Sequence, residues 1–138
     1  MEYGYKMKIT KKKSIKIISK FLEKKIVLEN WYQDIKPYLK AVILYGSVAK
    51  GTNRPDSDID ILFIIPLDTE EKYTKGEYSY KYEDQEINIV IRSIERIRDI
   101  ANRDPNSFQK EVFRDSEIIW QKDTEVQELL QKLDKDKI

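Results

Sequence analysis

Two aspartates, Asp58 and Asp60, stand one residue apart at the start of the hydrophobic run "DIDILFII". Because successive side chains of a strand point to opposite faces, both carboxylates are predicted to share one face while Ile59 turns to the core. Carboxylates at this spacing can bind one hard cation or bridge two, and without a cation they repel each other. Taken alone, the pair also fits two solvated aspartates at an exposed strand end.

A Gly-Ser pair adds a second chemical feature. Gly46 and Ser47 follow an earlier hydrophobic run, and ten residues separate Ser47 from Asp58. Backbone N–H groups at the start of a helical turn, together with a serine hydroxyl, favour a phosphate, and glycine permits its close approach. A phosphate-binding turn facing two carboxylates predicts a nucleoside triphosphate whose charge is carried by metal ions. The Gly-Ser pair alone also fits a plain turn.

The composition limits the chemistry further. The 138 residues include no Cys and no His, which excludes disulfides, thiolate or imidazole metal sites, and Ser-His or Cys-His nucleophiles. A metal must therefore be a hard cation with oxygen ligands, Mg²⁺ or Mn²⁺, and a general base must be a carboxylate, Lys or Tyr. The net charge of +1 gives no global argument for nucleic acid, which is not an expected partner. No apolar run is long enough to span a membrane, so a cytoplasmic protein is expected.

The elements that must position these residues follow from hydrophobic spacing. A strand is predicted at 40–45, a helical turn at 47–51 with Ser47 as its N-cap, and a second strand at 58–65. Alternating tyrosines and isoleucines over 78–91 predict a hairpin that turns at Asp84-Gln85. The remaining predicted elements are a polar connection at 67–77, helices at 93–104 (capped by Ser93), 106–115 and 124–135, and a strand at 117–121.

The N-terminal region is rich in lysine. Nine lysines fall within the first 25 residues, and apolar residues recur among them at helical spacing. This pattern favours an amphipathic helix capped by Ser14 over a nucleic-acid arm, and Pro37 ends it. We predict one domain over 1–138, with a helical region at 1–38 and a catalytic core at 39–138. The expected class is α+β, a small mixed, largely antiparallel sheet with helices packed on it.

The segment "YGSVAKG…SDID" resembles the signature of the DNA polymerase β-like nucleotidyltransferase superfamily, especially its minimal nucleotidyltransferases. Members of this group often read "FGSxARG…SDID", so Lys50 stands where an arginine is usual. The resemblance is strong over 42–64 and looser over the hairpin and 108–120, and it does not clearly include the lysine-rich N-terminus. It implies the polymerase β-like nucleotidyltransferase fold.

The resemblance also implies a mechanism. Asp58 and Asp60 would hold a divalent metal that organises an NTP, and Gly46 and Ser47 would hold its β- and γ-phosphates. An acceptor hydroxyl would attack the α-phosphorus, and pyrophosphate would leave. Three further residues are expected nearby: Lys50 and Arg54 to contact phosphate, unless they are simply solvated, and Ser57 to orient Asp58.

The third carboxylate of the family is the point of departure. Members usually carry it on a later strand in text such as "VDLVI", where it acts as general base and helps to hold a second metal. This chain reads "EINIVI", with Asn88 at that position. An amide cannot accept the proton and is a weaker metal ligand. Glu86 lies two residues earlier on the same predicted strand face and is the candidate substitute.

These features predict an enzyme that moves a nucleoside monophosphate, AMP from ATP in the first instance, to a hydroxyl on a protein or small molecule. Small members of this group often act as antitoxins that modify a HEPN-domain toxin, and the chain length fits that role. The alternative is a catalytically impaired nucleotide-binding module that acts through a partner protein, an interpretation motivated by Asn88. No membrane partner is expected, and an oligomer is compatible with the sequence.

Overall fold

The computed structural model describes residues 7–72, 76–102 and 111–134. Its centre is a five-stranded sheet with the strand order β3-β4-β2-β1-β5. The strands are β1 (Ala41–Tyr45), β2 (Ile59–Ile65), β3 (Glu77–Tyr82), β4 (Gln85–Ser93) and β5 (Glu117–Gln121). Only β2 and β4 pair in parallel, and the other neighbours are antiparallel. The predicted α+β class with a mixed, largely antiparallel sheet is confirmed.

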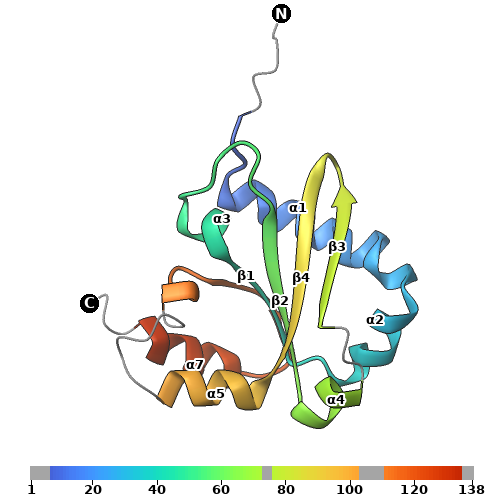
Figure 1. Cartoon of the computed structure of the whole chain (residues 1–138), viewed down its shortest axis with the longest axis vertical. Coiled ribbons are helices and arrows are strands. Elements are labelled where there is room, and N and C mark those ends of the chain that lie inside the picture. Colours follow the sequence, from blue (N-terminus) through green and yellow to red (C-terminus); the bar gives the residue numbers. More distant parts are fainter. Residues whose placement is uncertain (1–6, 73–75, 103–110, 135–138) are drawn as a thin grey trace, which may run out of the picture.

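Helices cover both faces of this sheet (Figure 1). Helices α1 (Lys11–Lys24) and α2 (Asn30–Ile35) pack on one face, and α5 (Ile94–Asn102) and α7 (Glu125–Asp134) on the other. The shorter elements connect strands or helices: α3 (Gly46–Lys50), α4 (Leu67–Lys72), and 3₁₀ helices Ile26–Leu28 and Lys36–Tyr38. No helix among the described residues is long and apolar enough to cross a membrane.

Strand β2 divides its side chains between the two layers. Ile59, Ile61, Phe63 and Ile65 pack with α1 and α2, whereas Leu62 and Ile64 pack with α5 and α7. Each fully buried side chain of this size contributes about 1.5–3 kcal/mol to stability. Asp60 shares the Leu62 face by strand alternation, so the buried isoleucines fix the direction in which its carboxylate points.

Two predicted caps are wrong. Helix α1 begins at Lys11, and the hydroxyl of Thr10 accepts a hydrogen bond from the Lys13 N–H at 3.1 Å. Ser14 lies in the first turn and donates to the carbonyl of Lys11. Helix α3 begins at Gly46 without a side-chain cap, so Ser47 lies inside the helix. In both cases the helix begins earlier than the sequence pattern indicates, at Lys11 and at Gly46, so the predicted cap lies inside the helix.

Two other boundaries also differ from the predictions. The polar connection at 67–77 contains α4, whose single buried residue is Thr69. The hairpin turns at Glu83 and Asp84, both with positive φ (48° and 64°), so Gln85 already belongs to β4. The confirmed features include β5, α7 and the Ser93 cap, whose hydroxyl accepts from the Arg96 N–H at 3.1 Å. The first half of the helix predicted at 106–115, and the end of the helix predicted at 93–104, fall outside the described residues, and 111–115 are a short helical segment followed by a turn.

Candidate active site

The turn between β1 and α3 lies directly against the second aspartate. Gly46 has a φ of +80°, a left-handed conformation that glycine adopts without steric cost. A Cβ atom at this position would stand 2.6 Å from Oδ2 of Asp60, closer than Cβ atoms come to a non-bonded neighbour. The absence of a side chain therefore brings the predicted phosphate turn into contact with the predicted metal ligand.

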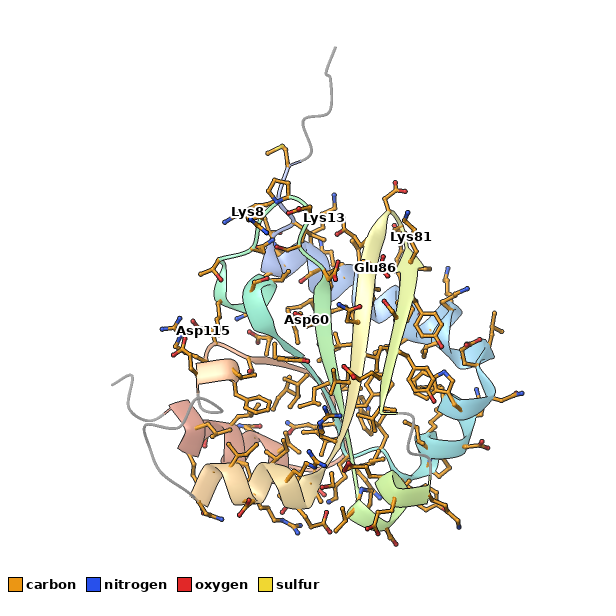
Figure 2. The ribbon with its side chains drawn as sticks, in the orientation of Figure 1. Lys8, Lys13, Asp60, Lys81, Glu86 and Asp115 are labelled. Carbon is orange, nitrogen blue, oxygen red and sulfur yellow. The ribbon has the colours of Figure 1, made fainter. Side chains whose placement is uncertain are left out.

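The two aspartates lie on the same side of the sheet, as predicted. Asp58 precedes β2 and is exposed, whereas Asp60 is its second residue and is partly buried. The side-chain nitrogen of Asn88 stands 2.9 Å from Oδ2 of Asp58 and 3.4 Å from Oδ1 of Asp60, so one amide group reaches both carboxylates. Figure 2 places Asp60, Glu86 and Lys81 toward the same end of the sheet.

Ionisation of the inner aspartate is disfavoured in the folded protein. Burial is the main reason that the pKa of the Asp60 carboxyl lies above its ordinary value, and the charge of Asp58 raises it further. The hydrogen bond from Asn88 acts in the opposite direction without cancelling these effects. The site thus holds two acidic groups whose joint ionisation a nearby cation would favour.

Asn88 occupies the position expected for the third carboxylate. The parallel pairing of β2 and β4 sets Asn88 in register with Asp60. Its Oδ1 accepts a hydrogen bond from the hydroxyl of Ser79 on β3 at 2.8 Å, and the same hydroxyl lies 2.8 Å from Oε2 of Glu86. Extending the register from the Ile59–Ile87 pair by one residue puts Glu86 opposite Asp58. Asn88 therefore contacts both aspartates, and the Ser79 hydroxyl lies between Asn88 and Glu86.

Comparison with protein families agrees with this arrangement. The family model described as "Polymerase beta, Nucleotidyltransferase" matches residues 27–125, which is most of the chain. The chain belongs to the polymerase beta nucleotidyltransferase family. The matched residues include α2 and all five strands of the sheet.

The other comparisons add less. No curated protein matches the chain. A crystal structure of a protein assigned as a nucleotidyltransferase from Sulfolobus solfataricus is 16% identical, with a TM-score of 0.43. The alignment covers 81% of this chain and 84% of that one. The family assignment accordingly depends on the family model together with the sheet topology and the site described above.

The other predicted nucleotide-binding residues of this nucleotidyltransferase domain surround α3. Lys50 lies in the last turn of α3, with its Nζ 3.7 Å from Oε2 of Glu111. The hydroxyl of Ser57 accepts a hydrogen bond from the Arg54 N–H at 2.8 Å, so it closes the turn before the aspartates instead of bonding to Asp58. Arg54 is 82% exposed and lies 3.8 Å from Asp56. Lys50 is thus next to the phosphate turn, whereas Arg54 points to solvent.

A cleft of about 530 Å³, which the sequence did not predict, lies on the sheet face that Leu62 and Asp60 share. Its sheet side includes Tyr45, which pairs in register with Asp60, and Arg92 of β4, and Phe113 lies 6.2 Å from Tyr45 between ring centroids. Burial, followed by the charge of Asp60, raises the pKa of Tyr45 to about 12, although Arg92 acts to lower it. The phenol therefore stays neutral and can serve as a hydrogen-bond donor or acceptor.

Ser79 and one cleft residue, Glu77, could have been found from one signal in the sequence. The residues that alternate with Tyr78, Tyr80 and Tyr82 must face the other side of the sheet, where Asp60 lies. This pattern puts Glu77, Ser79 and Lys81 on the site face. It does not reveal which of them meets Asn88, because that depends on the register of the hairpin.

Proposed function

We propose that the chain is a metal-dependent nucleotidyltransferase that moves a nucleoside monophosphate, AMP from ATP in the first instance, to a hydroxyl on a protein or small molecule. The observation that carries this proposal is the close approach of Gly46 to Asp60, which puts the turn at the start of α3 beside the carboxylate pair. Membership in the polymerase beta nucleotidyltransferase family supports the reaction class.

The aspartate pair fits a hard divalent cation. Asp58 and Asp60 offer carboxylate oxygens, the ligands that Mg²⁺ and Mn²⁺ prefer, and Gly46 leaves open the space beside Asp60 that a side chain would fill. When bound, the cation would supply neutralisation of the charge on the triphosphate and on the developing transition state.

The remaining steps belong to the chain itself. Gly46 and Ser47 hold the β- and γ-phosphates through backbone N–H groups and the serine hydroxyl, and Lys50 adds positive charge at the end of α3. The acceptor oxygen forms a bond to the α-phosphorus while the bond to the oxygen bridging to the β-phosphate breaks. Pyrophosphate leaves with that oxygen, and Glu86 accepts the proton of the acceptor hydroxyl.

The cleft supplies the acceptor end of this reaction. Attack on a phosphoryl group runs roughly in line with the departing oxygen, so the acceptor enters opposite the phosphate turn. The phosphate turn lies on the β1 side of Asp60, and Asn88 and Glu86 on β4 lie on the opposite side. The cleft includes Val90 and Arg92 of β4, and about 530 Å³ suits a small molecule or a protruding side chain.

A HEPN-type toxin protein is the proposed macromolecular acceptor, with the chain acting as its antitoxin. Support for this partner comes from the resemblance of "YGSVAKG…SDID" to minimal nucleotidyltransferases and from the length of 138 residues. A partner would supply the helical surface that presents the hydroxyl at the cleft.

The second candidate is a nucleotide-binding module that lacks transfer activity. Asn88 favours this function, because it places an amide where a carboxylate would accept the proton and hold metal. The two candidates agree on nucleotide binding at Gly46 and Ser47 and differ only in whether the α-phosphorus is attacked.

Labelled ATP with Mg²⁺ and a candidate HEPN partner, or a mixture of small hydroxyl compounds, separates these functions. We expect label transfer that falls at least about 100-fold in Asp58→Ala and in Asp60→Ala. Asp34→Ala, which removes an exposed carboxylate of α2, is the matched control and should transfer normally. ATP binding without transfer to any acceptor would favour the module, and transfer that survives both site variants would contradict the proposed site.

A further inference from the structure

The carboxylate pair is in contact with a neutral group on its β4 side. Asn88 stands in register with Asp60, and its side-chain nitrogen lies within hydrogen-bond reach of both Asp58 and Asp60 (2.9 and 3.4 Å). An amide nitrogen is a donor only, so its hydrogens present partial positive charge to the space between the strands. That space is where a third carboxylate would have to lie to share a second cation with the aspartates.

The orientation of this amide is held from the other side. The hydroxyl of Ser79 donates to Oδ1 of Asn88 at 2.8 Å, which turns the nitrogen toward the aspartates. If the amide were reversed, its oxygen would face the aspartates and its nitrogen would donate to Ser79. The metal ligands would then include one additional neutral oxygen, from Asn88, but their total charge would still be the two negative charges of Asp58 and Asp60.

Glu86 does not restore the missing charge at this position. Its Oε2 lies 2.8 Å from the hydroxyl of Ser79, whereas the side chain in hydrogen-bond reach of both aspartates is Asn88. Among the described residues, no group of three or more Asp, Glu, His or Cys side chains is arranged to hold a metal ion. The site therefore offers a charge of −2 to metal from side chains, enough to balance one divalent cation.

A second cation would meet an unfavourable balance of charge. Two divalent ions in a shared site stand about 3.5–4 Å apart, and their mutual repulsion is four times that of two unit charges at this distance. Shared carboxylates normally offset this repulsion, and here one of the three expected carboxylates is an amide. Without nucleotide, the pair of aspartates leaves two divalent cations with a surplus of two positive charges. With nucleotide bound, the triphosphate would offset charge but would not supply the carboxylate ligand that is missing at Asn88.

We propose that this site takes a single divalent cation, held by Asp58 and Asp60, and that the neutral side chain of Asn88 is the reason a second cation does not bind. The inference rests on the proposed function, since it assumes that the aspartate pair is the metal site. It goes beyond that function because it predicts one cation, where the family resemblance implies two, and it attributes the difference to Asn88.

The experiment counts Mn²⁺ on the full chain by equilibrium dialysis and records electron paramagnetic resonance, with and without a non-hydrolysable α,β-methylene ATP analogue. We expect one Mn²⁺ per chain and no signal from an exchange-coupled Mn²⁺ pair in either condition. Asn88→Asp should bind two Mn²⁺ with the analogue present and show the coupled signal. Asn88→Ala, which removes the amide without adding a ligand, should stay at one.

Two Mn²⁺ ions with a coupled signal on the wild-type chain would overturn the inference, as would Asn88→Asp remaining at one in a folded protein. If Asn88→Asp does not fold, the number of Mn²⁺ ions on the wild-type chain is sufficient to test the inference. The double variant Asp58→Asn/Asp60→Asn separates this inference from the proposed function. The proposed metal site itself would be overturned if the wild-type chain bound no Mn²⁺, or if the double variant bound as much Mn²⁺ as the wild type. If the wild type bound two Mn²⁺ ions and the double variant lost them, only the cation count would be overturned.

Discussion

Gly46 and Asp60 lie so close together that a Cβ atom on the glycine would stand 2.6 Å from Oδ2 of the aspartate. One residue belongs to the turn that starts α3 and the other to β2, and the antiparallel pairing of Tyr45 with Asp60 brings them together. Any side chain at position 46 must displace the carboxylate or the turn. The contact thus couples the proposed phosphate site to the proposed metal site.

Replacement of this glycine should affect both folding and binding. We expect Gly46→Ala to destabilise the protein by about 1–2 kcal/mol because of its left-handed conformation, with a further cost from the contact with Asp60. ATP affinity should fall about tenfold or more, the equivalent of about 1.4 kcal/mol. Thermal unfolding and calorimetric titration with ATP and Mg²⁺ measure the two effects.

Gly51 offers a matched control for this variant. Its φ is +76°, and a Cβ there would meet no atom within 4 Å. Gly51→Ala should therefore lower the free energy of unfolding by a similar amount, about 1–2 kcal/mol, because of backbone strain, while the ATP affinity stays at the wild-type value. Equal loss of affinity in both variants would show that strain at α3, and not the contact with Asp60, controls binding.

The buried carboxylate of Asp60 should make stability depend on pH. Its folded-state pKa is raised, chiefly by burial, so between the unfolded and folded pKa values the native state binds more protons and stability falls as pH rises. Above the folded pKa the full cost of the buried charge is present. Asp60→Asn removes that cost, so it should melt at a higher temperature than the wild type at pH 7.5 without divalent metal.

The same gain should shrink as the pH falls and be nearly absent at about pH 3.5, below the unfolded pKa of about 3.9, where the wild-type carboxyl is mostly protonated in both states. Melting curves at pH 7.5 and pH 3.5 test this difference. Asp58→Asn is the control, since Asp58 is exposed and its replacement relieves repulsion without relieving burial. A gain for Asp60→Asn that is the same at both pH values would indicate a cause other than ionisation.

The parts of the site that the sequence could predict depend on local patterns. The alternation of side chains along a strand was enough to place Asp58 and Asp60 on one face, and Gly46-Ser47 was enough to predict a turn beside a strand end. The contact of Asn88 with the aspartates depends on parallel pairing between strands that are about 25 residues apart in the chain. Such register has no local signal, because it follows from the packing of the whole sheet.

The N-terminal cap of α1 was mispredicted for a local reason. The apolar pattern begins at Ile15, which favoured Ser14 as the cap, whereas the helix already begins at Lys11. Lysines have good helix propensity and extend the helix by one turn without an apolar residue. The hydrogen bond from the Lys13 N–H then goes to Thr10.

Two alanine variants test which residue caps the N-terminus of α1. Thr10→Ala removes the side chain that accepts the Lys13 N–H and should cost about 1 kcal/mol of stability. Ser14→Ala removes a buried hydroxyl that bonds back to the Lys11 carbonyl inside the helix, and the higher helix propensity of alanine offsets part of that loss, so it should cost less stability than Thr10→Ala. Chemical denaturation gives both values, and the reverse ranking would place the cap at Ser14.

Glu86 is the proposed proton acceptor, and its replacement tests that role. Glu86→Gln keeps the size of the side chain and an oxygen next to the Ser79 hydroxyl but cannot take up a proton. We expect the rate of transfer to fall about 100-fold or more. In the wild type the rate should rise with pH as Glu86 loses its proton, and this rise should be lost in Glu86→Gln. Asn88→Ala, which removes only the amide beside the aspartates, should lower the rate by a smaller factor.

Glu83→Gln supplies the matched control for this comparison, because Glu83 is an exposed carboxylate in the turn of the same hairpin and contacts Lys20 on α1. Its rate and pH profile should equal those of the wild type. A rate loss in Asn88→Ala that exceeds the loss in Glu86→Gln would move the decisive role from the carboxylate to the amide. The pH profile separates the two causes, since loss of a proton acceptor changes its shape whereas loss of cation positioning lowers the rate at every pH.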